Sequence, residues 1–182
     1  MNSSKVSFLF TLFMILIFSH SLIPASCQSL FESICKETLE NEGACIQLMK
    51  SDPRIPSATN YVDLTNYILD MAIKKATEGQ NYLLDLMKTN PSKAIHQCAT
   101  IDYNGSISSF KTAKVDLTQD PPTASYDAKI AGDGPANCAE AIKAENINNP
   151  TIFDINKTML LLSDIASFAA NKVGSKGTLY LE

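Results

Sequence analysis

Apolar residues recur every three or four positions along most of this chain after residue 28, which is the pattern of amphipathic helices. The clearest stripe begins directly after Asn149-Pro150, a cap residue followed by proline at the first helical position, and it ends at Gly174. We therefore predict a long C-terminal helix, and long seams of this kind are typical of antiparallel bundles. The stripe consists of Ile152, Ile155, Met159, Leu162, Ala166, Ala169 and Val173.

A second long helix is predicted from about Ala58 to Lys88. Gly79 interrupts the pattern, which costs about 1 kcal/mol relative to alanine in a helix interior. Asn90-Pro91 ends this helix and is suited to open the next one. The residues that share its apolar face are Tyr61, Leu64, Ile68, Met71, Ala72, Tyr82, Leu83 and Leu86.

The third predicted helix, roughly Pro91 to Thr118, is less regular. Its apolar stripe is in one phase up to Ile101 and is shifted by one or two residues from Tyr103 onward. The slip falls near Asn104-Gly105, a pair that is also a β-hairpin signal. Because the flanking strands would be only three or four residues long in an otherwise helical chain, we favour an irregular helix.

A firm break follows at Asp120-Pro121-Pro122-Thr123, and a fourth helical stretch carries Cys138. Gly132-Asp133-Gly134-Pro135 lies inside that stretch and should kink or split it. Ahead of the bundle, two short amphipathic turns flank Asn41-Glu42-Gly43. We expect one domain over 28–182, with a hairpin at 28–55 and a bundle at 56–174.

The first 27 residues have the layout of a secretory signal peptide. Lys5 precedes a thirteen-residue apolar run, Val6 to Phe18, which is too short to span a bilayer. Small residues in Ala25-Ser26-Cys27 favour cleavage before Gln28. The alternative is a bacterial lipoprotein acylated at Cys27, but Pro24 is a poor fit to that signal. We therefore expect a secreted protein.

Four cysteines remain after cleavage: Cys35, Cys45, Cys98 and Cys138. An even number in a secreted chain indicates two disulfides, for which three pairings exist. Cys35 and Cys45 are ten residues apart, which suits a clamp on a helical hairpin. Cys98 and Cys138 fall on different predicted bundle helices, and a bond between them would join neighbours.

The residue types give no support for an enzyme or a cofactor. The mature chain has one histidine, His96, and on a helix it points about 200° away from Cys98, so the two cannot form a nucleophile and its base. No metal cluster, phosphate loop or nucleophile elbow is present in the sequence. Acidic residues at helical spacing, such as Asp63 and Asp70, are typical of a solvated outer face.

Charge and short motifs add two expectations. The mature chain has 14 basic and 19 acidic residues, which disfavours nucleic acid and anionic lipid and suits a basic protein partner. Asn104-Gly105-Ser106 and Asn156-Lys157-Thr158 match the pattern for N-glycosylation. Asn156 borders the seam of the last helix, where a glycan would crowd the packing.

Several of these features together resemble the plant family of pectin methylesterase inhibitors and invertase inhibitors, which includes related pollen allergens. The resemblance covers about Leu30 to Val173. It rests on the order and spacing of the four cysteines, and no single motif is diagnostic. The segments that carry it are Ile34-Cys35 and Cys45, Met49-Lys50-Ser51-Asp52-Pro53-Arg54, the long helix from Ala58, Cys98, Asp120-Pro121 ahead of Cys138, and the final helix.

The resemblance implies an all-α fold, an up-down-up-down four-helix bundle with an N-terminal helical hairpin, and the disulfides Cys35–Cys45 and Cys98–Cys138. It also implies an inhibitor that covers the substrate cleft of a carbohydrate-acting enzyme in a one-to-one complex. The expected location is the extracellular space and cell wall, with the vacuole as an alternative. After signal cleavage we expect no membrane attachment.

The target is a choice between two enzymes. Invertase inhibitors of this family carry Pro-Lys-Phe after an acidic residue in the loop before the third bundle helix. Here that place reads Asp120-Pro121-Pro122-Thr123, so the basic and aromatic contacts are missing. This departure favours pectin methylesterase, with invertase as the alternative. Gly134-Pro135 also departs from the family pattern, which leaves open a relative with neither activity.

A rival interpretation from another class is a secreted helical protein without inhibitory activity, either a carrier of a small apolar ligand or an allergen-like protein. A carrier should hold an apolar cavity among its helices, whereas a solid core would exclude it. An enzyme stands third.

Overall fold

A computed structural model of the protein describes residues 28–177. The signal peptide predicted at 1–27 lies outside the described residues. The regular elements are all helices, as predicted, and no β-strand forms within 28–177. Within the same range, none of the helices combines the length and apolar character needed to span a bilayer.

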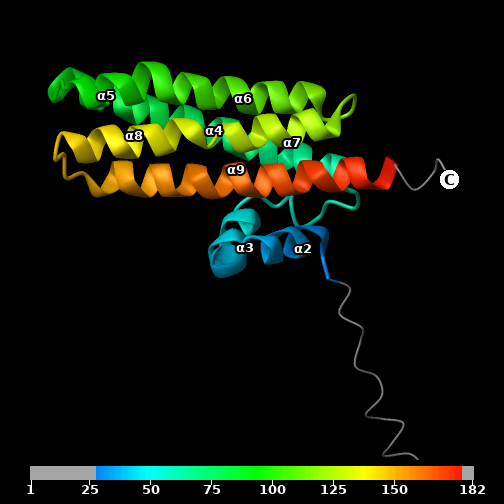
Figure 1. Ribbon diagram of the computed structural model, residues 1–182. Helices are drawn as coiled ribbons and strands as arrows, with labels where there is room; N and C mark the ends of the chain where they lie inside the picture. The colour runs from blue at the N-terminus through cyan, green and yellow to red at the C-terminus, as the bar shows by residue number, and fades with distance from the viewer. Residues whose placement is uncertain (1–27, 178–182) are drawn as a thin grey trace, which may run out of the picture.

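Four antiparallel rods form a bundle (Figure 1). The N-terminal hairpin packs beside this bundle against α4 and α9, and its helices α2 and α3 are joined by a short 3₁₀ turn. The hairpin elements are α2 Leu30–Glu37, η1 Leu39–Asn41 and α3 Glu42–Lys50. The rods are α4 Tyr61–Thr89, then α5 Lys93–Gln97 continued through η2 Cys98–Asp102 into α6 Tyr103–Asp116, then α7 Pro121–Ile130 with α8 Asp133–Ala144, and finally α9 Pro150–Gly177.

The two long helices begin at capping asparagines. The Oδ1 atom of Asn60 accepts a hydrogen bond from the backbone N–H of Asp63, so α4 begins at Tyr61, slightly after the expected start. Asn149 caps α9 in the same way and accepts from the N–H of Ile152 at 3.2 Å, as the Asn-Pro signal predicted.

The expected end of the last helix at Gly174 is wrong, because α9 continues to Gly177. Gly174 has helical backbone and faces α7, where an added Cβ would lie 3.4 Å from Cβ of Pro121. Glycine is a weak stop signal when tertiary packing holds the next turn in place, since its low helix propensity amounts to only about 1 kcal/mol.

The predicted irregularity in the third rod is a π-helical segment, η2, between α5 and α6. A π turn holds more residues than an α turn, so it moves the apolar stripe around the helix axis. This is the physical cause of the phase slip, which begins at Cys98, ahead of Asn104. The β-hairpin alternative is not formed at this place.

The fourth rod is split into α7 and α8, as Gly132 to Pro135 predicted. Gly134 lies in the first turn of α8 and is buried against η2. A Cβ at this position would lie 2.2 Å from the backbone oxygen of Asp102 and 2.3 Å from Oγ of Ser106. Glycine at 134 therefore permits the close approach of α8 to the π segment.

Both disulfides have the expected pairing. Cys35–Cys45 joins α2 to α3, with a Cα–Cα distance of 5.4 Å, and closes the hairpin. Cys98–Cys138 joins η2 to α8, with a Cα–Cα distance of 4.8 Å, at the place where Gly134 permits close packing. All four cysteines are buried.

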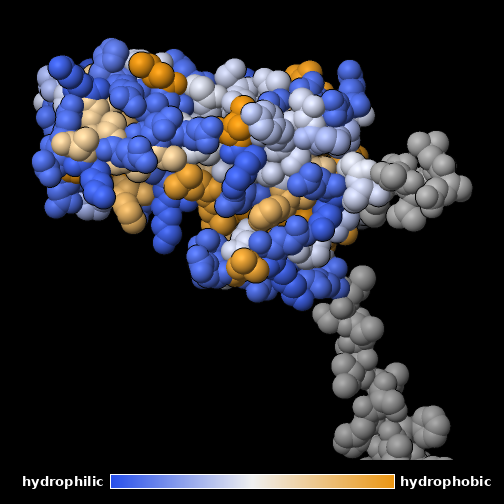
Figure 2. Space-filling view, in the orientation of Figure 1, coloured by the Kyte–Doolittle hydropathy of each residue, from blue (hydrophilic) through white to orange (hydrophobic). Residues whose placement is uncertain are grey.

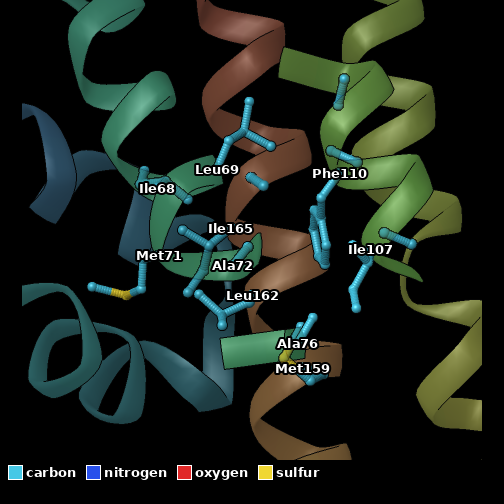
Figure 3. Packing of buried hydrophobic residues seen from close by; sticks show 14 of the residues in the cluster. Ile68, Leu69, Met71, Ala72, Ala76, Ile107, Phe110, Met159, Leu162 and Ile165 are labelled. Atoms are coloured by element: carbon cyan, nitrogen blue, oxygen red, sulfur yellow. The ribbon is translucent and has the colours of Figure 1, made fainter. Parts of the chain in front are cut away.

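A contiguous apolar core fills the bundle. Figure 3 shows side chains from α4, α6 and α9 pointing toward one another, among them Leu69, Phe110 and Leu162. Gly79, the apparent interruption of α4, is buried because α4 approaches Ile155 and Tyr103 closely there; an added Cβ would lie 2.7 Å from Cγ2 of Ile155. The side chains of the described core pack against each other, and a cleft of about 690 Å³ opens at its margin, between α8 and α9.

Candidate functional site

The sequence-predicted contact segment, Asp120 to Thr123, forms the start of α7. Oδ1 of Asp120 accepts from the backbone N–H of Thr123 at 3.2 Å, and Oδ2 accepts from the Thr123 hydroxyl at 2.7 Å. Pro121 stands at the first helical position, where its fixed φ suits the helix. The cap and the proline together hold this segment in one conformation.

This rigid turn lies at one end of the bundle, where α6 passes into α7 (Figure 1). Pro121 and Pro122 pack beside Gly174 near the end of α9. Asp120, Pro122 and Thr123 are nevertheless exposed, while Pro121 is half-buried. The turn is therefore supported from inside and open to a partner from outside.

Two large hydrophobic side chains are exposed on the helices that flank this turn. Tyr126, one helical turn after Thr123 on α7, has 65% of its surface exposed, and Val115 near the end of α6 has 69% exposed. Partly exposed aromatic residues are enriched at the centres of protein interfaces. We name the surface formed by Val115, Asp120, Pro122, Thr123 and Tyr126 the α6–α7 face.

Sequence reasoning missed Tyr126 and Val115. Both lie off the apolar stripes that identify the buried sides of their helices, so they look like ordinary surface positions in the sequence. The signal that could have revealed Tyr126 is its spacing of three from Thr123, which places it on the same side of α7 as the predicted contact segment.

Two carboxylates meet between α6 and α7, close to this face. Partial burial raises the pKa of Asp127, and the charge of Asp116 together with the hydrogen bond between the two carboxyl groups raises it further. A proton shared by the pair relieves the repulsion of two negative charges.

The acidic residues of α4 take part in ion pairs or caps. Asp70 accepts from Lys114 of α6 and lies 3.5 Å from Nη1 of Arg54. Asp63 accepts from the side chain of Asn60 at the start of the helix. These contacts fit the expected solvated outer face.

His96 and Cys98 make separate contacts and do not form a pair. His96 is exposed on α5, and its Nδ1 is 3.4 Å from the Thr100 hydroxyl. Cys98 is bonded to Cys138, so neither sulfur is free to act as a thiolate ligand or nucleophile. Burial raises the pKa of the neighbouring Asp102, opposed by a hydrogen bond from Gln97.

The structure separates the two candidate glycosylation sites. Asn104 is exposed on α6, where its side chain bonds Gln80 and the backbone oxygen of Thr100, and its glycosylation stays a prediction. Asn156 is only 3% exposed, and its Oδ1 accepts from the Tyr103 hydroxyl at 2.7 Å in the core. A glycan at this position would have to leave from a buried side chain, and the glycosylation of Asn156 stays a prediction.

Comparison with known proteins identifies the fold and the family. A family model described as plant invertase/pectin methylesterase inhibitor matches residues 29–170. A mutant form of a pectin methylesterase inhibitor from Arabidopsis has a similar structure, with a TM-score of 0.69 and 22% identity over 79% of this chain and 96% of that one. A pectin methylesterase inhibitor from Arabidopsis thaliana gives 0.58 and 22% over 78% and 93%. Among curated proteins no match was found.

Proposed function

Since the chain belongs to the plant invertase/pectin methylesterase inhibitor family, we propose that it is a secreted inhibitor of pectin methylesterase that acts in a one-to-one complex. The proteins of this family are inhibitors and not enzymes, so the chain itself carries out no reaction. Its site of action on this proposal is the cell wall, where the signal peptide predicted at 1–27 would direct it.

The observation that carries the proposal is the exposed and rigid α6–α7 face. Tyr126 and Val115 offer apolar surface, and the capped turn at Asp120 holds Pro122 and Thr123 in place. A preorganised surface loses little conformational entropy on binding, so more of the contact energy appears as affinity. Placed over a substrate cleft, such a face blocks access without chemistry of its own.

The preference for pectin methylesterase over invertase rests on Pro122 and Thr123. The family's invertase pattern has lysine and phenylalanine after the Asp-Pro pair, and this chain has neither at those positions. Tyr126 supplies an aromatic ring on the same side of α7, displaced along the helix axis by about 4.5 Å from the position of Thr123. A partner that requires an aromatic side chain at 123 would meet a gap here.

The test is a titration of the purified, disulfide-bonded protein against both enzymes at mildly acidic pH and at two ionic strengths. We expect inhibition of pectin methylesterase that saturates at one inhibitor per enzyme and little inhibition of invertase. Because the chain is acidic, association with a basic enzyme should slow as salt rises. Inhibition of invertase with pectin methylesterase unaffected would reverse the assignment.

A double substitution tests whether the turn selects the target. Pro122→Lys with Thr123→Phe introduces the invertase pattern after Asp120. It keeps the bond from the backbone N–H of residue 123 to Asp120 and removes the bond from the Thr123 hydroxyl. We expect it to raise affinity for invertase. A double variant that behaves like the parent toward both enzymes would show that specificity is set elsewhere.

A further inference from the structure

A cleft of about 690 Å³ lies at the other end of the bundle, between the end of α8 and the start of α9. A volume of this size is in the range of small-molecule binding sites. The lining is mainly apolar, with amide groups and one ammonium group among it. The lining includes Ala139, Ile142, Ile147 and Phe153 on the apolar side and Lys143 and Asn156 among the polar groups.

The walls of this cleft are preformed. At the end of α8 the backbone N–H of Ile147 donates to the oxygen of Ile142 and that of Asn146 donates to the oxygen of Lys143, each at 3.0 Å. These two bonds, with a φ of 53° at Asn146, make a Schellman motif that fixes Ile142 and Ile147 in the lining. The capping bond of Asn149 to Ile152 fixes the opposite wall.

The charge in the cleft has one sign. Among the described residues that line it, Lys143 is the charged one, although the whole chain carries a net charge of −4. The nearby carboxylate of Glu145 is turned toward α5, where Oε1 accepts from the backbone N–H of Ala94 at 3.0 Å. An anionic group in the cleft would therefore meet an ammonium group and no facing carboxylate.

Asn156 adds a polar group to the wall of the cleft. The residue is 3% exposed and lines the cleft, and its Oδ1 accepts from the Tyr103 hydroxyl at 2.7 Å. Because Oδ1 is engaged with Tyr103, the Nδ2 group is the donor of this amide from which a carboxylate oxygen in the cleft would accept.

The apolar part of the lining is open at Phe153, which is 67% exposed. A second cleft of about 320 Å³ adjoins the first and shares Ala139, Phe153 and Asn156 with it. Figure 2 shows hydrophobic surface over α9 beside the hairpin, on a face that is otherwise largely hydrophilic. An elongated apolar body could thus extend from Lys143 along α9.

We propose that this cleft binds a small organic monocarboxylate with an apolar body. The carboxylate pairs with the Lys143 ammonium and accepts from Nδ2 of Asn156, and the apolar body packs against Ile142, Ile147 and Phe153. The cleft is separated from Asp120 by most of the length of α9, about 36 Å from Pro150 to Gly174 at the rise of an α-helix. Binding here is a function separate from target inhibition.

Calorimetric titration of the mature, disulfide-bonded chain with decanoate and with 1-decanol tests the proposal. We expect saturable binding of decanoate at one site and weaker binding of decanol. Lys143→Glu should weaken decanoate binding about tenfold or more and leave decanol unchanged. The matched control is Lys111→Glu, an exposed position on α6 outside the linings of both clefts, which should change either affinity less than twofold.

A second variant tests whether the probes bind in the cleft and leaves the polar groups of the lining unchanged. Ala139 is exposed on α8 and lines the mouth, so Ala139→Trp should fill it, abolish binding of both probes and leave the fold intact. Absence of saturable decanoate binding by the parent protein would overturn the proposal. So would equal affinity in Lys143→Glu, or binding that persists in Ala139→Trp.

Discussion

Single residues in this protein act mainly through how closely they allow helices to approach. Gly134 admits the backbone oxygen of Asp102, and Gly79 admits Tyr103 and Ile155. At the surface, single side chains are the candidates for recognition. Tyr126 and Phe153 project from their helices at opposite ends of the bundle with nearly equal exposure, 65% and 67%.

Gly134→Ala should lower the free energy of unfolding by about 1–3 kcal/mol, because the new methyl group overlaps the oxygen of Asp102 and forces α8 away from η2. Urea denaturation measures this. Gly105→Ala is the matched control: an added Cβ at Gly105 has nothing within 4 Å, so helix propensity should raise stability by up to about 1 kcal/mol. Equal effects of the two changes would contradict the close approach.

Tyr126→Ala should weaken inhibition of pectin methylesterase about thirtyfold, the loss typical of a buried aromatic anchor at an interface. Phe153→Ala removes a similarly exposed ring from the far end of the bundle and should leave inhibition within twofold of the parent. Steady-state inhibition constants for both variants check this. If Phe153→Ala proved the more damaging change, the target would contact the other end.

At the scale of elements, the bundle is held by contacts that link helices distant in sequence. The Cys98–Cys138 bond ties the π segment to α8, while Cys35–Cys45 acts within the hairpin. Lys172 of α9 pairs with Glu37 of α2 at 2.6 Å and so joins the hairpin to the bundle. Asp116 and Asp127 form a contact between α6 and α7 in which both side chains are carboxyl groups.

Removing each disulfide in turn by paired Cys→Ala changes should show that the two bonds contribute unequally to the free energy of unfolding. In the chain-entropy model the long loop of Cys98–Cys138 contributes about 4 kcal/mol and the short loop of Cys35–Cys45 about 3 kcal/mol. The loss of the long bond should therefore lower the urea midpoint more. A larger loss from the hairpin bond would mean that the bundle depends on the hairpin more than its loop length suggests.

Asp127→Asn should raise the melting temperature at pH 7. The pKa of the Asp127 carboxyl is raised in the folded state above its ordinary value of about 3.8. The stability that the protonated carboxyl contributes is therefore fully present below pH 3.8 and is lost as pH rises through the folded pKa. The gain from the asparagine should therefore shrink toward zero as pH falls to about 3.5. Glu140→Gln, an exposed change in α8 that also removes one carboxylate, is the control. A gain that is equal at both pH values would contradict this cause.

At the scale of the whole molecule, the sequence predicted the structure best where one side of a helix is buried, because apolar residues then recur every three or four positions. The stripes from Tyr61 and from Ile152 predicted α4 and α9, and the break at Asp120 predicted the start of α7. Helix ends were predicted less well, because Gly174 remains helical through packing with Pro121, a contact between segments far apart in the chain.

The candidate surface was only partly predictable for the same reason. Local capping chemistry reveals the turn at Asp120, whereas the exposure of Val115 depends on which side of α6 packs against α4 and α7. Asn156 shows the reverse case, because its sequence motif predicts a glycan while the fold buries it beside Tyr103. Motifs describe a chain before it folds, and tertiary contacts decide which of them stay accessible.

The most direct test of the account is hydroxyl-radical footprinting of the chain alone and bound to pectin methylesterase. Tyr126 and Phe153 are both reactive rings of nearly equal exposure, so each serves as the other's reference within one experiment. We expect oxidation of Tyr126 to fall strongly in the complex while oxidation of Phe153 is unchanged. Protection of Phe153 with Tyr126 still oxidised, or no protection of either ring at saturating enzyme, would contradict the assignment of the α6–α7 face.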